Sequence, residues 1–588
     1  MSIYDKSSLV LIPSGTKTGK VFSQKPVSGD GDFTFTRASA ATRVNADGNI
    51  EKETSNLLLQ SNSFDTTWAQ PNASVTGGQS GYDGSSDAWL LQNNAGFTTT
   101  ANVRQNLSLG SSVRSFSVYA KQGNVDWLRI LMYDGSIPHQ CWFNLTDGST
   151  ANASDIIDSK STSVGGGWYR CEISANTNIT SVNIYPTSVA GSSFSDNGGS
   201  IYIQDAQLNQ GLIAQEVITT TTAAVYGGIT DNTPRLDYTD SSCPALLLEP
   251  QRTNKCPNSE LYGTSFINTS VTRNAVSAPS GYIEAGRLLD NNSLGEHLLG
   301  HNFSSFASGE THSISCFFKA DATGGRAVIR YYGGSWVYAV YNLDSGEVEV
   351  ENGGITADIV PYANGWYRCI LTHTTTLNYA PMVTQIGIAN SNNQFFYQGA
   401  SNLGLYFYGY QAETGSYPTS YIPTYGSSVS RVVETCFKTG VSDLIGQTEG
   451  VLYCEFINKI DNDGGIYNML LTISDSANDY AFISKRNPTG IDINLGTNAN
   501  IYITSGIFNT DGATYKVAAA YKNNDFVVYV NGVQIWSDTS GTIAFSNADK
   551  LSLGSYYTQT LNFNSGIKQA LLFKTRLSNE ELATLTTI

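Results

Sequence analysis

The sequence predicts an all-β protein made of tandem β-sandwich domains of the jelly-roll type. Tyr, Phe, Thr and Val favour the pleated, half-buried surface of a sheet, and the 588 residues include 34 Tyr and 24 Phe but only 4 Met. Runs rich in Ala, Glu, Lys, Leu and Met, which long helices prefer, are scarce. Short alternating segments are separated by Gly-Asn and Asp-Gly turns, which is the pattern of a sandwich with many short strands.

A second observation is a long internal repeat. The sequence GWYRC at 167–171 recurs at 365–369, an offset of 198 residues. A period of this length corresponds to a whole domain rather than to a solenoid unit, so two copies of one domain are expected in tandem. The same offset relates Arg37 to Arg235, Glu51 to Glu249, Asn56 to Asn254, Ser115 to Ser313 and Lys121 to Lys319.

The repeat divides the chain into four segments. The first of them is polar apart from one apolar patch at 9–12, and we expect it to be dispensable for folding, because it buries too little apolar surface to become ordered alone. The last one follows no repeat and is expected to be a different domain. The boundaries are 1–34 for the N-terminal segment, 35–232 for the first repeat with a module at 56–214 after its lead-in, 233–435 for the second repeat with a module at 254–431, and 436–588 for the last domain.

Apolar residues at every second position predict the strands of the modules. In residues 114–121, Phe116, Val118 and Ala120 share one face, as in a half-buried strand.

Turn and cap residues predict two elements of the last domain. Asn531-Gly532 lies between two apolar runs and predicts a two-residue hairpin, because a type I′ turn needs positive φ at both positions. Ser578 followed by Glu581 is a capping box, and it predicts a helix near the C-terminal end.

Charge and hydropathy exclude two classes of partner. The formal net charge is −16, whereas nucleic-acid binding needs clustered Lys and Arg to neutralise phosphates. No apolar run reaches the length of about 18 residues that a membrane-spanning helix needs. Residues 1–12 lack the basic and apolar regions of a secretory signal, so synthesis and folding in a cytoplasm are expected.

The eight Cys residues show no metal-binding or disulfide pattern. They contain no CxxC motif and no zinc-ligand spacing. Cys171 and Cys369 correspond in the repeat, whereas Cys141 falls on Ala339, and a duplicated disulfide would duplicate both of its halves. We therefore expect the Cys residues to act as small buried apolar side chains.

Several stretches resemble known proteins. The sequences FTRASAATR at 35–43 and CPALLLEPQRTN at 243–254 resemble the lead-ins of bacteriophage head-spike and tail-fibre proteins. The modules, with SFSVYAK at 115–121 and GGWYR at 166–170, resemble the jelly-roll domains of carbohydrate-binding modules in such fibres. The last domain, with VYVNGV at 528–533, resembles concanavalin A-like or laminin G-like sandwiches.

This resemblance implies a bacteriophage virion fibre or spike protein, made in the host cytoplasm and attached to the head or the tail of the particle. Residues 1–34 would anchor it to other virion proteins, the sandwiches would bind host-surface or environmental glycans, and a homotrimer is the implied assembly. Two alternatives remain open: a structural capsid or tail decoration protein without glycan binding, and a depolymerising tailspike.

The motifs predict no enzymatic activity. The sequence contains no GxSxG nucleophile turn, no HExxH zinc motif and no glycine-rich phosphate loop that ends in Lys-Ser or Lys-Thr. The catalytic carboxylates of a glycosidase module should occur in both copies of that module. The acidic pair that is in register, Glu51 and Glu249, lies in the lead-ins instead.

Two pairs of residues are candidates for metal binding. His297 and His301 are spaced i, i+4, which on a helix could bind zinc, but no helix cap precedes them, and a pair in the core or on the surface is the alternative. Asp461 and Asp463 could hold Ca²⁺ through oxygen atoms, as the laminin G-like resemblance implies, or remain solvated turn residues. No other cofactor is expected.

Aromatic side chains are the candidates for glycan contacts, because sugars stack on exposed rings. Trp168 and Trp366 correspond in the repeat and are expected in the core, and Tyr133 falls on Tyr331 at the same offset. Aromatic residues without an aromatic counterpart are free to specialise. The resulting candidates are Trp127 and Trp142 in the first module, Tyr332, Trp336 and Tyr338 in the second, and Trp536, Tyr556 and Tyr557 in the last domain, where a place in the core is the alternative for Trp536.

The disulfide argument gives a direct test. Alkylation of the denatured, unreduced protein is expected to modify all eight Cys residues, because none has a partner in the duplicated pattern. Intact mass before and after alkylation counts the modified sites. A pair that stays protected until a reductant is added would contradict this prediction.

Overall fold

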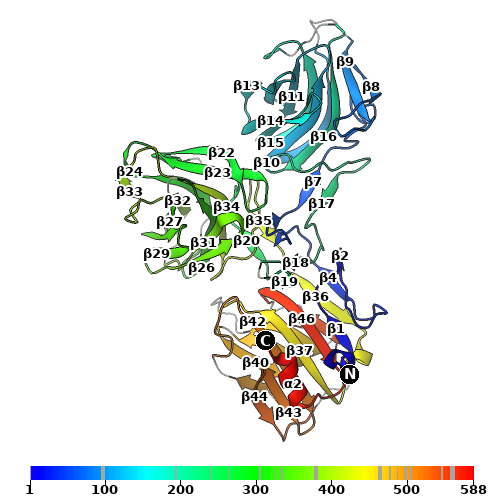
Figure 1. The fold of residues 1–588 in the computed structure, drawn as a ribbon, viewed down its shortest axis with the longest axis vertical. Coiled ribbons are helices and arrows are strands. Elements are labelled where there is room, and N and C mark those ends of the chain that lie inside the picture. The colour runs from blue at the N-terminus through cyan, green and yellow to red at the C-terminus, as the bar shows by residue number, and fades with distance from the viewer. Residues whose placement is uncertain are drawn as a thin grey trace.

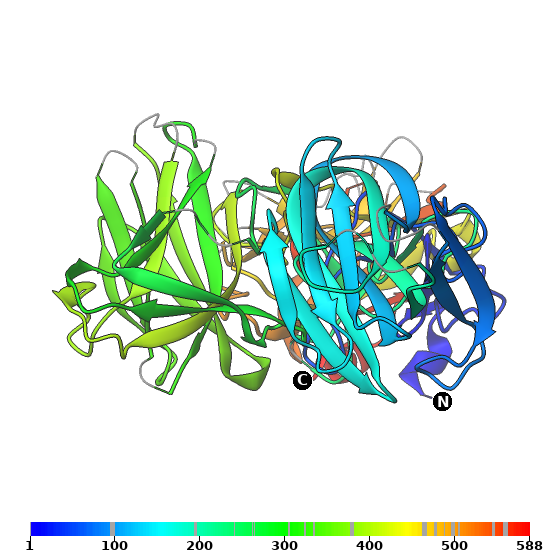
Figure 2. The same cartoon turned by 90° about the horizontal axis from the view of Figure 1, so that it is seen from above.

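The chain forms three β-sandwich lobes that meet at a central junction, and both termini lie in the same lobe (Figure 1). The computed structural model describes residues 2–588 except 95–99, 193, 195–196, 240, 262, 264, 304–305, 323–324, 333–334, 377–381, 461–466, 476–478, 487, 496–499, 504–505, 544–546 and 557–562. Seen from above, the second module projects to one side of the other two lobes (Figure 2). The all-β prediction is confirmed. The helical elements of the described ranges are α1 (Ile3–Lys6), α2 (Asn579–Thr586), η1 (Ala363–Gly365) and η2 (Ser442–Leu444).

The first module is a sandwich in which two long strands belong to both layers. Strands β10 and β15 are 20 residues each and pair with each other, with register shifts between residues 106 and 112. The first half of β15 pairs with β14 and its second half with β11, so each half serves a different layer. The strands are β8 (Ala73–Gln79), β9 (Ala88–Asn93), β10 (Val103–Gln122), β11 (Trp127–Tyr133), β12 (Pro138–Asn144), β13 (Thr150–Ser154), β14 (Asp158–Gly165), β15 (Trp168–Thr187) and β16 (Ser200–Gln210).

The second module repeats this architecture as two separate six-stranded sheets. Their orders are β22-β23-β34-β26-β31-β30 and β21-β25-β32-β27-β28-β29, and β24 pairs with β33 beside them. The 198-residue offset maps the single strand β10 onto β25 and β26. One continuous strand of the first module thus corresponds to two strands of the second. The strands are β21 (Ser265–Ile267), β22 (Thr269–Ser277), β23 (Ile283–Asp290), β24 (Leu294–Glu296), β25 (Leu298–Phe303), β26 (Thr311–Ala320), β27 (Arg326–Tyr332), β28 (Trp336–Asn342), β29 (Glu347–Asn352), β30 (Thr356–Tyr362), β31 (Trp366–Thr374), β32 (Met382–Ile388), β33 (Phe396–Gln398) and β34 (Gly404–Thr414).

The third lobe is a sandwich formed by three distant parts of the chain. One sheet has the order β18-β19-β46-β37-β42-β43-β44 with β1 on β46, and the other has the order β2-β3-β4-β36-β45-β38-β39-β40-β41. Its strands are β1 (Leu9–Leu11), β2 (Thr16–Lys17), β3 (Lys20–Val21), β4 (Phe33–Thr36), β18 (Arg235–Asp237), β19 (Ala245–Leu248), β36 (Thr435–Thr439), β37 (Glu449–Ile457), β38 (Tyr467–Ser474), β39 (Asp479–Arg486), β40 (Gly490–Asn494), β41 (Asn500–Ile503), β42 (Thr514–Lys522), β43 (Phe526–Val530), β44 (Val533–Asp538), β45 (Lys550–Leu553) and β46 (Ser565–Phe573).

This pairing corrects the expectation that residues 1–34 lie apart from the folded domains. Leu9 pairs with Leu572 in β46, and Thr34 of β4 pairs with Phe437 in β36. Leu9 and Phe33 are fully buried in the core of the third lobe. The segment has few apolar side chains. They are buried against a sheet whose strands lie more than 400 residues further along the chain.

Small two-stranded sheets carry the chain through the junction. They pair β5 (Arg43–Val44) with β6 (Ile50–Glu51), β7 (Thr54–Asn56) with β17 (Val225–Gly227), and β20 (Arg252–Asn254) with β35 (Val429–Arg431). Each module is therefore closed at its base by a pair of strands from its own two ends. No helix in the described part of the chain is long and apolar enough to cross a membrane.

The two local predictions for the last domain are confirmed. Asn531 and Gly532 have φ values of 48° and 82°, as a type I′ hairpin between β43 and β44 requires. The Ser578 hydroxyl accepts a hydrogen bond of 3.2 Å from the backbone N–H of Glu581 at the start of α2.

The contribution of the N-terminal strands gives a stability test. Leu9→Ala is expected to lower the free energy of unfolding of the third lobe by about 2 to 5 kcal/mol, because it leaves a cavity in a closed core. Val27→Ala, at a side chain that is 96% exposed, is the control and should change little. Urea unfolding of both variants measures the difference. If removal of residues 1–34 left the transition unchanged, the role given to these strands would be wrong.

Candidate functional site

The second module presents aromatic and charged side chains on the outer face of one sheet. In β27 and β28, Ile329, Tyr331 and Ala339 point into the core. Because side chains alternate along a strand, the residues between them point to the opposite face. These residues are Arg330, Tyr332, Trp336 and Tyr338, and Gln385 of β32 lies directly opposite Arg330 on the same face.

Arg330 is the fixed centre of this face. Its guanidinium donates two hydrogen bonds to the carboxylate of Glu296, of 2.8 and 2.6 Å, and one of 2.6 Å to Gln385. It lies 4.1 Å from the ring centroid of Trp336 and 5.1 Å from that of Phe395. A planar guanidinium that is fixed by three hydrogen bonds holds such rings in place through cation–π contact.

The rings around Arg330 form a platform that is partly open to solvent. The Trp336 side chain is 39% exposed, and Tyr332 and Tyr338 are half-buried. Tyr332 lies 5.3 Å from Trp336, and Tyr338 lies 5.0 Å from Phe395, both edge to face. An exposed indole that is held from below can stack on the apolar face of a sugar with little loss of side-chain entropy.

The corresponding face of the first module is covered. Arg129 lies between the rings of Trp142 and Tyr185, 5.0 and 4.6 Å from their centroids. The Trp142 indole donates a hydrogen bond of 2.7 Å to the carbonyl of Ser192, and only 4% of this residue is exposed. Trp142 is thus a buried contact rather than a sugar platform. Trp127, at the start of β11, is half-buried.

Strand pairing corrects one equivalence drawn from the repeat. Tyr133 lies opposite Pro138, and Tyr332 lies opposite Trp336, which is the residue that the 198-residue offset relates to Pro138. Tyr133 therefore corresponds to Tyr332 and not to Tyr331. The second module has changed the neighbours of this conserved ring, because Trp336 replaces Pro138 beside it.

The candidates in the third lobe are only partly described. Trp536 is half-buried and packs against the core, which favours the structural interpretation. The Tyr556 ring lies 6.4 Å from that of Phe482. Tyr557, Asp461 and Asp463 lie outside the described residues. Among the residues that are described, no group of three His, Cys, Asp or Glu side chains could hold a metal ion.

The two histidines at i, i+4 are core residues rather than metal ligands. His297 contacts the carbonyl oxygens of Asn268 and Tyr397 at 2.9 and 3.2 Å. His301 stacks on Tyr410 at 5.0 Å, and burial lowers the pKa of His301 to about 4. Both Trp168 and Trp366 are buried, as predicted for residues that the two copies share.

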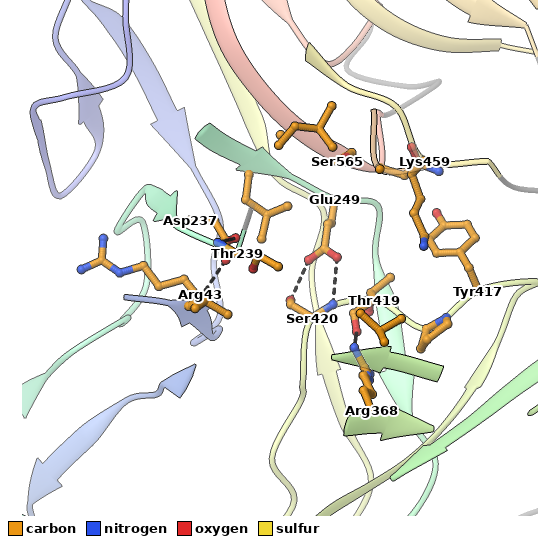
Figure 3. A pocket seen from close by; sticks show the side chains of 18 of the residues that line it. Arg43, Asp237, Thr239, Glu249, Arg368, Tyr417, Thr419, Ser420, Lys459 and Ser565 are labelled. Carbon is orange, nitrogen blue, oxygen red and sulfur yellow. Dashed lines mark hydrogen bonds between the residues drawn. The ribbon is translucent and has the colours of Figure 1, made fainter. Parts of the chain in front are cut away.

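A cavity of about 250 Å³ lies where the lead-ins, the second module and the third lobe meet (Figure 3). Its charged side chains already have partners inside the protein. Arg43 donates to Glu51 at 2.8 Å, and Lys459 donates to Asp511 at 3.0 Å. Glu249 accepts hydrogen bonds from both the backbone and the hydroxyl of Ser420. The cavity is therefore a gap between interlocked segments, and these three charged side chains are already bound by groups of the protein.

A buried network of five charges lies beside this cavity. Arg37 contacts Glu434 at 2.9 Å, and Arg235 and Arg431 each contact Glu249 at 2.8 Å. Arg235 also forms an ion pair with Glu434, and all five side chains are at most 6% exposed. Burial alone would raise the pKa of Glu249, but Arg431 and Arg235 outweigh it and hold this pKa at about 2. We call these five residues the arginine–glutamate network.

Comparison with known proteins identifies one part of the chain. Residues 456–583 match the family described as the concanavalin A-like lectin/glucanases superfamily, which confirms the type of sandwich predicted for the last domain. No curated protein matches the chain.

Two solved structures are similar to the chain at low sequence identity and low TM-score. The N-terminal CBM22-1-CBM22-2 tandem domain of Paenibacillus barcinonensis Xyn10C has 10% identity and a TM-score of 0.19, covering 61% of this chain and 96% of that chain. Trypanosoma rangeli sialidase in complex with sialic acid has 9% identity and a TM-score of 0.22, covering 94% and 97%. TM-scores this low carry no argument about function.

The arginine–glutamate network predicts loss of stability in acid. The carboxyl of Glu249 has its pKa lowered from 4.5 to about 2 in the folded chain, so its contribution is complete above pH 4.5 and is lost as the pH falls toward 2. Glu249→Gln should lower the free energy of unfolding at pH 7 by about 3 to 5 kcal/mol and flatten this pH dependence.

The repeat supplies a matched control. Glu51 corresponds to Glu249 but is partly exposed and pairs with Arg43, so Glu51→Gln should cost about 1 kcal/mol or less. Urea unfolding at a series of pH values compares the two variants. Equal effects of the two substitutions would contradict the role assigned to the network.

Proposed function

We propose that this protein is a non-enzymatic glycan-binding protein whose principal binding surface is the outer sheet face of the second module. The single observation that carries the proposal is Trp336, an exposed ring held rigidly on Arg330 beside Tyr332. Such a surface gives weak contacts to single sugars, which several copies of the protein would sum through multivalency. The corresponding face of the first module is covered, so the proposal assigns no glycan contact to that copy.

We further propose that the protein is a bacteriophage virion fibre or spike, assembled as a homotrimer in the host cytoplasm and attached to the head or the tail. The lead-in sequences at 35–43 and 243–254 support this role through their resemblance to such proteins. Because the N-terminal strands belong to the third lobe, attachment through the N-terminus would place that lobe next to the particle and the modules outward. This order is the reverse of the one that chain position alone implies.

Accessibility favours binding over hydrolysis. A retaining or inverting glycosidase needs two carboxylates on either side of a sugar bond. Glu260 and Glu284 are close to each other through Lys52, but each is only 1% exposed. A polysaccharide has no access to that pair. The structural decoration protein remains the second candidate, because the lobes also offer exposed apolar side chains such as Phe396.

The proposal predicts a specific loss of glycan binding. Trp336→Ala should reduce binding on a glycan array of bacterial surface polysaccharides by at least about tenfold, because one stacked ring contributes roughly 1 to 2 kcal/mol and multivalency amplifies the loss. Tyr226→Ala removes a ring that is 54% exposed on β17, far from this face, and is the matched control. Thermal unfolding of both variants should match that of the unchanged protein.

Each outcome of the array decides between the candidates. Binding by the unchanged protein that Trp336→Ala abolishes supports the proposal. Binding that survives Trp336→Ala places the site elsewhere, and an unchanged protein that binds no glycan favours the decoration protein. Release of reducing sugar from any polysaccharide on the array would overturn the non-enzymatic role.

A further inference from the structure

A lysine and two glutamates are enclosed between the first lead-in and the second module. Lys52 follows β6, Glu260 lies between β20 and β21, and Glu284 lies on β23. The Lys52 Nζ atom is 2.9 Å from Oε1 of Glu260 and 3.1 Å from both carboxylate oxygens of Glu284. These side chains are 4%, 1% and 1% exposed, so bulk water does not reach them.

Three tyrosine hydroxyls converge on one oxygen of Glu260. Tyr408, Tyr421 and Tyr425 donate hydrogen bonds to Oε1 at 3.0, 3.3 and 3.3 Å. Together with Lys52, this single oxygen therefore receives four donors. The other oxygen, Oε2, is buried and has no hydrogen-bond partner among the described residues. An ordinary ion pair would share its donors between both oxygens, so this asymmetry points to a different role for Glu260.

The charges in this enclosure do not balance when all three groups are ionised. One ammonium and two carboxylates leave a net negative charge in a site without solvent, which is unfavourable. Burial raises the pKa of Glu260, and the nearby charge of Glu284 raises it further, although Lys52 opposes both. Charge balance therefore favours a proton on Glu260, and the donors gathered on Oε1 leave Oε2 as the oxygen that carries it.

We propose that Lys52 and Glu260 condense to form an intramolecular isopeptide bond that covalently joins the first lead-in to the second module. Lys52 is the nucleophile, the Cδ atom of Glu260 is the electrophile, and Glu284 is the proton carrier. The three tyrosine hydroxyls lie where negative charge develops on Oε1, as the donors of an oxyanion hole do.

The reaction needs no further reagent. The Glu284 carboxylate takes a proton from the Lys52 ammonium, and the resulting amine attacks Cδ of Glu260, so that the Nζ–Cδ bond forms and the electron pair moves to Oε1. Glu284 returns this proton to the Oε2 hydroxyl, the Cδ–Oε2 bond breaks, and water leaves. The nitrogen then gives its surplus proton to Glu284. The products are an amide, one water and a neutral Glu284, so no charge remains buried.

The location explains what the bond would do. The two residues are 208 positions apart, and the loop between them contains the whole first module. Tyr425 also contacts the first module, because its carbonyl accepts hydrogen bonds from the backbone of Val113 and the hydroxyl of Ser112. A covalent bond here would fix the junction of both modules against pulling forces and would constrain the unfolded chain as a disulfide does.

Intact mass of the denatured full-length protein tests the proposal. Once the N-terminal residue has been identified, the measured mass should lie about 18 Da below the mass of the sequence, because one water has been lost. Proteolysis followed by peptide sequencing should yield a branched peptide that joins residue 52 to residue 260. A mass equal to that of the sequence would overturn the proposal, and a branch at residue 284 would overturn the assignment of Glu260.

Three variants identify the roles of the residues, each compared with the mass of its own sequence. Lys52→Arg removes the nucleophile and keeps the charge, and Glu284→Gln removes the proton carrier, so both should show no mass deficit. Lys255→Arg is the control: its lysine faces Glu310 at 3.7 Å in a partly exposed pair, and its deficit should remain about 18 Da. A deficit that persists in Glu284→Gln would overturn the proton-carrier role. Circular dichroism establishes that each variant is folded. The mass of the unchanged protein shows independently of the variants whether the isopeptide bond forms.

Discussion

The arrangement of the three lobes depends on the arginine–glutamate network at their junction. Arg37 belongs to the first lead-in, Arg235 and Glu249 to the second, and Glu434 to the stretch that leads into the third lobe. Charges that are this deeply buried are tolerated only when each of them has a partner, since a single unpaired one costs several kcal/mol. The network therefore ties these segments together, and β4, β19 and β36 each end or begin one residue away from it.

The same constraint explains why the chain begins and ends in one lobe. Strand β19 ends at Leu248, one residue before Glu249, and it pairs with β46 in the third sandwich. Strand β4 ends at Thr36, one residue before Arg37, and pairs with β36. Arg37 and Glu249 thus directly follow strands that the lead-ins contribute to the third lobe. That sandwich is completed by the lead-ins, so it is not an independent C-terminal domain in the spatial sense.

Local and repeated features could be predicted from the sequence, whereas features that join distant segments could not. Alternation, the Asn531-Gly532 turn and the Ser578 cap are encoded by neighbouring residues, and the structure confirms them. The repeat singled out Arg37, Arg235 and Glu249, but nothing in it showed that they meet. Residues 1–34 were expected to be separate because their own apolar content is low; the partner strand β46 lies at the other end of the chain.

The candidate site shows the same limit. Trp336, Tyr332 and Tyr338 could be found because they are aromatic, but Arg330, Glu296 and Gln385, which hold them, come from three strands and carry no local signal. Trp336 and Trp142 differ in burial, which decides between a platform and a core contact. Nothing in the sequence indicates that the carbonyl of Ser192 covers Trp142.

Duplication and the junction together account for the difference between the two modules. Each copy retains the buried Trp of its GWYRC motif and is closed at its base by a strand pair from its own ends, so its core does not depend on what the outer face carries. The outer face could then diverge. At the positions of Leu131 and Pro138 in the first module, strand pairing places Arg330 and Trp336 in the second. The second module thus carries a charged base with an aromatic ring above it where the first module has Leu131 and Pro138. Each module leaves the junction through its own strand pair, so the change on this face of the second copy does not alter how either copy is attached.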